Sequence, residues 1–443
     1  MAFRFNGFQI LMLYFVGIKL SLDYYYYAII SKTIGWKHIF LWNPDANSFF
    51  ASWLFTFILI FTFPKMYGSF LFYFFILFDS FIVLPIINLQ WATGQSLTFA
   101  SMVIIVDCIM HVVASLPMNR IYLHLDRMVA SKDLLIYTSL IGMALFTLIL
   151  VVASGGVDAR AWTFYILDNK SAYELRDEIQ FVLGTGYIYN WITKSMFCFV
   201  LCVALYNKNR SVAFVVIVLQ CILFSCYGQK MALFSIVFVF LVYYLFAIKK
   251  KGDAGFLFFL ILMVLCGLLM PSIEALKKYS DFYNLQFGIR TLYLPALIQY
   301  EYFGFFQSHE FLYFSEGLIG KLFGISYPYY RPIGMEVSAF FLGEGNGGNH
   351  NAGIFADAYS NFGFLGMIIF GIGLGYLLNI IDKLSFYIPT RLKVTIMGLY
   401  VMFLANNAFQ TTLLTNGLFI VIIMFALYNP TFYLRKLRNG KDY

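Results

Sequence analysis

Residues 69–89 read SFLFYFFILFDSFIVLPIINL, an apolar run that carries a single charged side chain, Asp79. A run of this length is what an α-helix needs to cross about 30 Å of hydrocarbon. Comparable runs recur along the whole chain, and 61% of its 443 residues are hydrophobic while only 12% are charged. This composition excludes an ordinary water-soluble fold and predicts an all-α, polytopic membrane protein.

The apolar runs predict twelve membrane spans within a single integral membrane domain, residues 1–443. We expect the spans at residues 8–31, 48–64, 69–89, 99–116, 134–154, 189–206, 211–228, 232–248, 256–273, 362–381, 394–414 and 416–429. The first run follows Arg4 and lacks a small-residue cleavage site, so we expect a retained span and not a cleaved signal peptide.

The distribution of Lys and Arg predicts the orientation of the spans. An even number of spans places both termini on one side, and the short loops of that side hold more than half of the 30 basic residues. By the positive-inside rule, this side is cytoplasmic. Two longer segments, 155–188 and 274–361, then form the outer face. The net charge of +8 does not indicate nucleic acid, because no basic face accompanies a soluble fold.

Two predicted spans carry pairs of ionisable residues at helical spacing. Lys19 and Asp23 are four residues apart, and so are Asp107 and His111, so the members of each pair lie on one helix face. Such pairs either lock a helix to its neighbours or relay protons, and the relay would indicate a transporter. We favour the lock. The same two interpretations apply to the isolated residues Asp79 and Lys194.

The six cysteines all lie in or beside apolar runs. This placement predicts no disulfide framework, and no pair has the spacing of a CxxC metal site. Cys198 and Cys202 are four apart on one predicted helix, where thiols act more often as small packing residues than as ligands. We expect no metal centre.

A polar, glycine-rich segment interrupts the apolar runs near the end of the outer face. Residues 343–366 read GEGNGGNHNAGIFADAYSNFGFLG. Its polar side chains are Glu344, Asn346, Asn349, His350, Asn351, Asp357, Ser360 and Asn361. Oriented backbone N–H groups, side-chain amides and a histidine are groups that can bind a sugar or a phosphate through hydrogen bonds. The alternative interpretation is a flexible turn.

Upstream, Arg290 stands in the uncharged segment FGIRTLYLP at residues 287–295. Burying a guanidinium without a partner costs several kcal/mol. We therefore expect Arg290 to pair with an acid such as Glu301 or with a phosphate ligand. Two aromatic stretches of the same outer segment, 303–306 and 327–330, predict short amphipathic helices at the membrane interface.

Two further cations lie at the predicted outer boundary. Arg176 precedes the turn Gly184-Thr-Gly-Tyr187, which suits either a short solvated helix or a phosphate contact at the headgroup level. Lys230 opens a helix after a very short turn, where a lysine either extends toward water or meets an anionic headgroup.

A series of short motifs runs through residues 170–381. In chain order it consists of Tyr173-Glu-Leu-Arg176, Gly184, Tyr187, Gln229-Lys230, Arg290 through Pro295, Tyr302, Phe305-Phe306, Asn349-His-Asn351, Asp357, Asn361-Phe-Gly363 and Gly366. The series resembles the O-antigen (Wzy-type) repeat-unit polymerases of bacterial inner membranes. His350-Asn351 before Gly363 is also similar to the His-Asn motif of the related O-antigen ligases, although the lead-in here is more polar and the spacing longer.

The resemblance implies a GT-C-like membrane architecture and a glycosyltransferase that works on the periplasmic face without a cofactor. The donor and the acceptor would both be undecaprenyl-diphosphate-linked oligosaccharides, and a chain-length regulator is a possible protein partner. The diphosphate would contact Arg176, Arg290 and Lys230. His350 would act as the base, with Asp357 or Glu344 orienting or replacing it. Sugars would contact Asn349, Asn351, His309 and Tyr187.

Three alternatives remain open from the sequence. An O-antigen ligase would use the same donor with lipid A-core as acceptor. A flippase for the lipid-linked unit would use the ionisable pairs inside the spans, but the long outer segment and the lack of internal repeats disfavour it. A membrane acyltransferase would rest on His350 and Asp357 alone.

Overall fold

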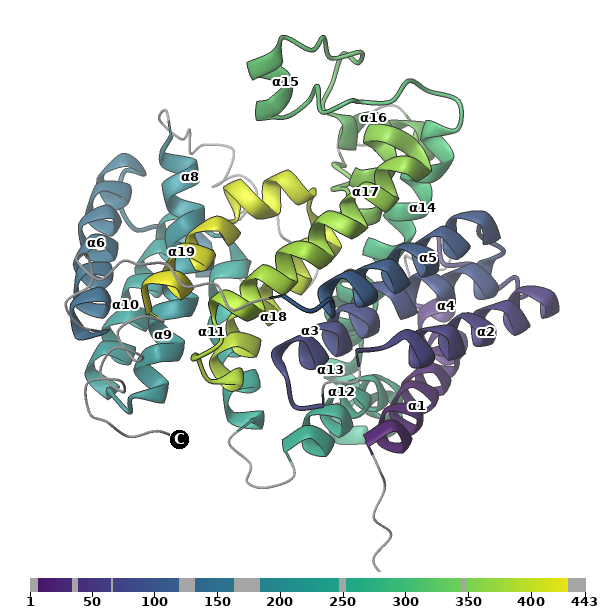
Figure 1. Ribbon diagram of the computed structural model, residues 1–443, viewed down its shortest axis with the longest axis horizontal. Helices are drawn as coiled ribbons and strands as arrows, with labels where there is room; N and C mark the ends of the chain where they lie inside the picture. Colours follow the sequence, from purple (N-terminus) through teal and green to yellow (C-terminus); the bar gives the residue numbers. More distant parts are fainter. Residues whose placement is uncertain are drawn as a thin grey trace, which may run out of the picture. The chain divides into compact units, whose positions relative to one another are not determined.

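The structure is a computed structural model. It describes residues 7–33, 39–64, 67–118, 132–162, 184–246, 252–343 and 348–428. Within these ranges every regular element is helical (Figure 1). Seven of the described helices are long and apolar enough to cross a membrane, which makes the chain a polytopic membrane protein. They are Phe70–Thr93, Leu97–Ala114, Leu134–Ala153, Thr185–Tyr206, Arg210–Tyr227, Gly255–Ser272 and Ile354–Leu384. Four shorter apolar helices are Ala46–Thr62, Lys230–Leu245, Ile333–Leu342 and Leu418–Tyr428.

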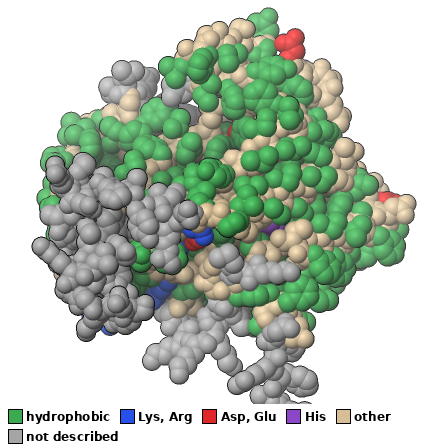
Figure 2. All heavy atoms as spheres, viewed as in Figure 1, with side chains coloured by type: hydrophobic (Ala, Val, Ile, Leu, Met, Phe, Trp, Pro, Cys, Tyr) green, Lys and Arg blue, Asp and Glu red, His purple; other side chains and the backbone are tan. Residues whose placement is uncertain are grey.

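The surface of these helices suits a lipid environment. Large apolar side chains are exposed on the helices that are long enough to cross a membrane, for example Val152 (75% exposed) and Phe214 (68% exposed). Figure 2 shows hydrophobic side chains over most of the face in view, with few charged ones. A soluble protein rarely exposes apolar surface on this scale.

The chain divides into two compact units. The first unit contains residues 1–117, 249–379 and 401–410. Its main elements are α1 (Gly7–Ala28), α2 (Ala46–Thr62), α3 (Phe70–Phe78), the π-helical η2 (Asp79–Val83), α4 (Leu84–Thr93), α5 (Leu97–Ala114), α12 (Gly252–Leu269), α13 (Glu274–Tyr283), the π-helical η6 (Asn284–Tyr293), α14 (Leu294–Phe306), α15 (Leu318–Phe323), α16 (Ile333–Leu342) and most of α17 (Ile354–Leu384). In Figure 1, α1, α2, α4 and α5 lie side by side in purple and blue. Short 3-10 turns, Ile30–Lys32 and Met270–Ser272, join the longer helices.

The second unit contains residues 118–248, 380–400 and 411–443. Its described elements are α6 (Lys132–Ala153), the 3-10 turn Ala159–Trp162, α8 (Thr185–Asn190), the π-helical η4 (Trp191–Met196), α9 (Phe197–Tyr206), α10 (Arg210–Tyr227), α11 (Lys230–Leu245), the first part of α18 (Thr390–Asn406), the π-helical η7 (Thr411–Thr415) and α19 (Leu418–Tyr428). Inside it, Lys194 donates to Asn416 Oδ1 at 2.8 Å, a contact that suits the predicted helix lock.

Polar residues at the helix ends explain where several of these helices begin. The side chains of Asp45, Ser69, Ser96 and Asn209 each accept a backbone N–H from the first turn of the helix that follows. Such N-caps satisfy N–H groups that have no partner within the helix. At the other end, Gly94 (φ 70°) closes α4 in the left-handed region that favours glycine.

Two predictions about element boundaries were wrong. The predicted span 394–414 is interrupted, because α18 ends at Asn406 and η7 begins only at Thr411. Within the outer segment 274–361 the structure has the five helical elements α13, η6, α14, α15 and α16, followed by the start of α17, but the two short amphipathic helices expected there are not formed. Residues 303–306 lie inside α14, a helix buried on nearly all sides, and residues 327–330 are not helical. The helix propensity of a short aromatic run does not indicate whether the run is buried, because tertiary packing decides burial.

Candidate functional site

Helix α14 carries a carboxylate into the interior of the first unit. Eleven of its thirteen residues are buried, and Glu301 is the only acid in LPALIQYEYFGFF. The helix starts where Pro295 stands at its first turn, a position that does not need the missing N–H. A carboxylate on such a helix needs a partner, because burial without one costs several kcal/mol.

His350 supplies that partner from the polar segment. Its Nδ1 lies 2.7 Å from Glu301 Oε2, and the two side chains are 13% and 10% exposed. The backbone of the same residue is fixed twice, since its N–H donates to Gly334 O at 3.0 Å and its carbonyl accepts the Tyr302 hydroxyl at 2.8 Å. The contact is an ion pair, and neither atom makes a hydrogen bond of good geometry within the described residues. A carboxylate this close to Nδ1 favours a proton on that nitrogen, which leaves Nε2 to exchange one.

Tyr302 stays a hydrogen-bond donor in these surroundings. Burial raises the pKa of its hydroxyl well above the usual value, and the nearby carboxylates of Glu316 and Asp357 raise it further. The hydroxyl is therefore protonated over the whole physiological range. It can hold the His350 carbonyl in place over that whole range.

Asp357 is a buried residue of the first unit. It lies at the start of α17, where its Oδ2 accepts the Phe409 N–H at 2.7 Å and its Oδ1 accepts from Asn361 Nδ2 at 3.1 Å. The predicted orienting residues for His350 were Asp357 and Glu344. In the structure Glu301 is the acid that contacts the imidazole, while both Asp357 oxygens accept hydrogen bonds from other groups. A role of Asp357 or Glu344 in place of His350 stays a prediction. Glu344 lies outside the described residues.

A kink in α17 positions the end of the site. Phe362 (φ −145°) and Gly363 (φ 62°, ψ −147°) leave the helical conformation, and only glycine adopts the second of these readily. Just before the kink, Asn361 Oδ1 accepts the Phe314 N–H at 2.6 Å and Ser360 O accepts the Leu312 N–H at 2.8 Å. The short first part of α17 is thus tied to the segment that follows α14.

An aromatic cluster beside this segment contains His309. The imidazole stacks on Phe305, with ring centres 3.9 Å apart and planes at 7°, and its Nδ1 lies 2.8 Å from Phe305 O. Phe340 meets His309 edge-on at 5.4 Å and is itself 54% exposed. Phe305 is buried, so the exposed part of this cluster is the ring of Phe340 beside the half-buried His309.

Arg290 does not pair with Glu301. It lies in η6 and is exposed, and it makes no ion pair or side-chain hydrogen bond with another residue of the described ranges. The expectation of a buried guanidinium was wrong, because the π-helical segment turns this side chain outward while Phe287 and Ile289 are buried. Asn349 and Asn351, which flank His350, are exposed as well.

The remaining predicted site residues lie elsewhere. Arg176 is outside the described residues. Tyr187 and Lys230 belong to the second unit, where Tyr187 is 49% exposed beside Trp191 (ring centres 6.2 Å apart) and Lys230 begins α11 half-buried. Sequence reasoning missed the role of Glu301. The sequence contained one indication of it, because Glu301 is the one charged residue of the largely apolar helix α14.

Comparisons with known proteins do not add to this site. No family model, no curated protein and no solved structure matches the chain.

Proposed function

We propose that the chain is a bacterial inner-membrane glycosyltransferase that polymerises undecaprenyl-diphosphate-linked oligosaccharide repeat units into O-antigen or a similar surface polysaccharide. The observation that carries this proposal is the contact of His350 Nδ1 with Glu301 Oε2 at 2.7 Å. A carboxylate-oriented imidazole at the edge of a membrane unit is suited to accept the proton of a sugar hydroxyl.

In this proposal His350 Nε2 takes the proton from the acceptor hydroxyl as its oxygen attacks the anomeric carbon of the donor. Glu301 stabilises the imidazolium that forms. The bond between the anomeric carbon and the diphosphate oxygen breaks, and the leaving diphosphate carries the charge away. Arg290 is exposed and without a protein partner in the described ranges, so its guanidinium can meet that charge. Arg176 and Lys230 remain the further predicted cations.

The sugars of both lipid-linked chains would lie against the outer segment. The exposed ring of Phe340, which meets His309 edge-on, offers an apolar surface, and the exposed amides of Asn349 and Asn351 offer hydrogen bonds beside His350. No metal or cofactor is required in this step. The substrates enter from the lipid, so the membrane itself is the partner that concentrates them.

The proposed topology has twelve spans in one GT-C-like membrane domain, with both termini cytoplasmic and the site periplasmic. The seven long helices would be joined by α1, α2, α11, α18 and α19, each of which overlaps a predicted span, α18 only in part. Helix α16 would then stay on the outer face, in the segment that carries His350.

Complementation tests the proposal. In a host that lacks its own copy, we expect His350→Ala and Glu301→Gln to abolish long chains on a lipopolysaccharide gel and to leave lipid A-core with one repeat unit. Glu310→Gln is the matched control, because this exposed acid follows the same helix and its side chain contacts neither residue of the pair.

A reconstituted reaction with purified lipid-linked repeat units gives the rate. Loss of a general base lowers the rate of proton transfer by about 100-fold or more, so both variants should fall by that factor while Glu310→Gln does not. Normal long chains from both variants would overturn the proposal. Core without any attached repeat in the deletion host would instead indicate a ligase.

A further inference from the structure

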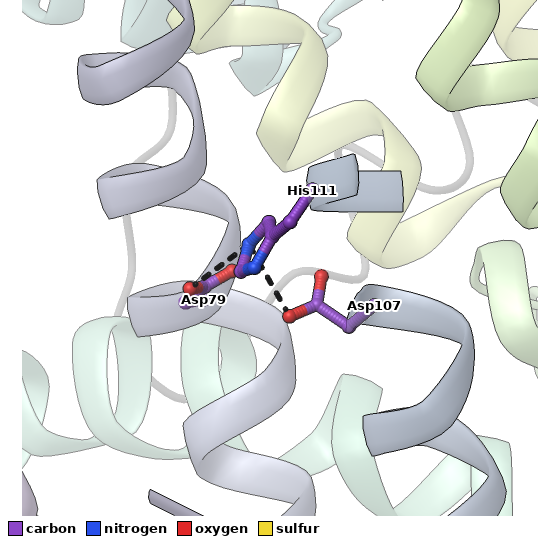
Figure 3. Close-up of side chains that lie close together, drawn as sticks. All are labelled: Asp79, Asp107 and His111. Atoms are coloured by element: carbon purple, nitrogen blue, oxygen red, sulfur yellow. Dashed lines mark ion pairs between the residues drawn. The ribbon is translucent and has the colours of Figure 1, made fainter. Parts of the chain in front are cut away.

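Three ionisable side chains meet inside the helices of the first unit, away from the site described above. Asp79 is the first residue of η2, and Asp107 and His111 lie one turn apart on α5. We call them the Asp–His–Asp cluster. Their exposed fractions are 0%, 0% and 1%. Figure 3 shows the imidazole lying between the two carboxylates, which come from different helices.

The distances in the cluster are too long for hydrogen bonds. His111 Nε2 lies 3.5 Å from Asp79 Oδ2 and 3.5 Å from Asp107 Oδ2. An N–H···O hydrogen bond measures about 2.7–3.2 Å. None of the four carboxylate oxygens accepts a hydrogen bond from any residue within the described ranges. Two buried carboxylates with no donor are strongly unfavourable in their ionised form unless positive charge compensates them.

The other ring nitrogen indicates how His111 is oriented. Thr62 Oγ1 donates to Ile58 O at 3.0 Å and lies 3.4 Å from His111 Nδ1. At 3.4 Å this contact is long for a hydrogen bond and therefore weak. Because the threonine proton is already used, the threonine oxygen is the acceptor in it, which favours the proton on Nδ1. The lone pair of Nε2 then points toward two carboxylates. A ligating histidine is held in this way, with its second nitrogen donating to a neighbouring oxygen.

We propose that the Asp–His–Asp cluster binds one divalent transition-metal ion of the zinc type. Two ligands at about 2.1 Å from a tetrahedral metal ion lie about 3.4 Å apart, which matches both 3.5 Å separations. All three ligand atoms lie within 4.8 Å of one another. A charge of +2 neutralises two carboxylates, which a single proton does not. An imidazole with two carboxylates suits zinc, manganese or iron better than magnesium or calcium.

The surroundings hold the three ligands in place. Phe75 and Phe63 meet the His111 ring edge-on, with ring centres 4.5 and 5.3 Å away. Asp79 stands where α3 changes to the π-helical η2, and single π-helical turns inside helices occur frequently at functional sites. Three protein ligands leave a fourth position on the metal, as in zinc sites that bind water or substrate. This inference goes beyond the proposed function and does not rest on it.

Metal analysis of the purified full-length chain tests the proposal. With an affinity tag that contains no histidine run, we expect about one equivalent of metal per chain after incubation with Zn²⁺ and removal of the excess. Asp79→Asn, Asp107→Asn and His111→Gln should each retain less than a tenth of that amount. Asp45→Asn is the control, because it removes an exposed carboxylate of the same unit and asparagine still caps α2.

Cobalt gives a second readout that does not depend on the folding of the ligand variants. Co²⁺ in the wild-type chain should show the intense visible absorption of a tetrahedral site without a sulfur charge-transfer band. Thr62→Val keeps the shape of the side chain and should weaken Zn²⁺ binding about 10- to 100-fold. A folded wild-type chain that takes up neither Zn²⁺ nor Co²⁺ would overturn the proposal and favour a proton site. Equal uptake by the ligand variants would overturn it as well.

Discussion

Two sets of ionisable side chains buried among the helices of the first unit differ in how their charges are balanced. Lys19 donates to Asp23 Oδ1, and Asn88 and Trp91 donate to the same oxygen, the latter at 2.9 Å. The ammonium also lies over the rings of Trp53 and Trp91, 5.4 and 5.6 Å from their centres. This set contains one positive and one negative charge and several donors. The Asp–His–Asp cluster has two acids, one imidazole and no donor to either acid among the described residues.

The difference shows what helical spacing leaves undecided. Lys19 and Asp23, like Asp107 and His111, are four residues apart on one helix. The two sets differ in the side chains that a second helix adds to the pair, which come from α4 in the first set and from η2 in the second. The helix α4 brings two donors to Asp23, whereas η2 brings a further carboxylate to His111. The first set balances its charge within the protein, although all its donors converge on Asp23 Oδ1 and Oδ2 accepts none. The second set holds two acids and no cationic side chain within 4 Å among the described residues, and we propose that a metal ion supplies the missing charge.

The largest effect should follow from removing the cation of the first set. Lys19→Met leaves Asp23 buried with neutral donors alone, and an uncompensated buried charge costs about 3–5 kcal/mol. The measurement is the unfolding free energy in detergent micelles, followed by Trp fluorescence. Asp107→Asn, which removes one of two neighbouring acids, should in the absence of metal cost far less or stabilise the chain.

A double variant tests whether the loss of stability in Lys19→Met comes from the uncompensated charge of Asp23. A double variant, Lys19→Met with Asp23→Asn, should recover part of the lost stability, since the uncompensated charge is gone. If Lys19→Met costs no more than Asp107→Asn in metal-free buffer, the contrast between the two sets does not hold.

A smaller effect should follow from adding metal. A ligand that binds only the folded state stabilises it by about 2.7 kcal/mol at a free concentration of 100 times its Kd. Zn²⁺ should therefore raise the unfolding free energy of the wild type, and a chelator should reverse the change. Asp45→Asn should respond like the wild type and Asp79→Asn should not. An equal response of Asp79→Asn would assign the stabilisation to another site.

Part of this organisation follows from the sequence and part does not. Long apolar runs such as residues 69–89 predict helices, because a chain in lipid must satisfy its backbone internally. The residues of the polar segment, His350 among them, are predicted to be functional because they are expensive to place beside a membrane. The partner of His350 is not predictable from spacing, because Glu301 is brought to it by the packing of α14. Likewise Asp79 is far from Asp107 in sequence, and only the packing of η2 against α5 joins them.

The smallest effect should come from removing one donor of the first set. Trp91→Phe keeps a ring that can meet Trp42 and Phe49, whose centres lie 5.3 and 5.0 Å from that of Trp91, but it deletes the N–H to Asp23 Oδ1. A hydrogen bond to a charged group contributes about 1.5–3 kcal/mol, and the lower end is expected here because the ammonium of Lys19 still donates to the same oxygen. The unfolding free energy of Trp91→Phe should thus fall between those of the wild type and Lys19→Met. A loss as large as that of Lys19→Met would mean that the indole donor, and not the ammonium, is what keeps Asp23 compensated.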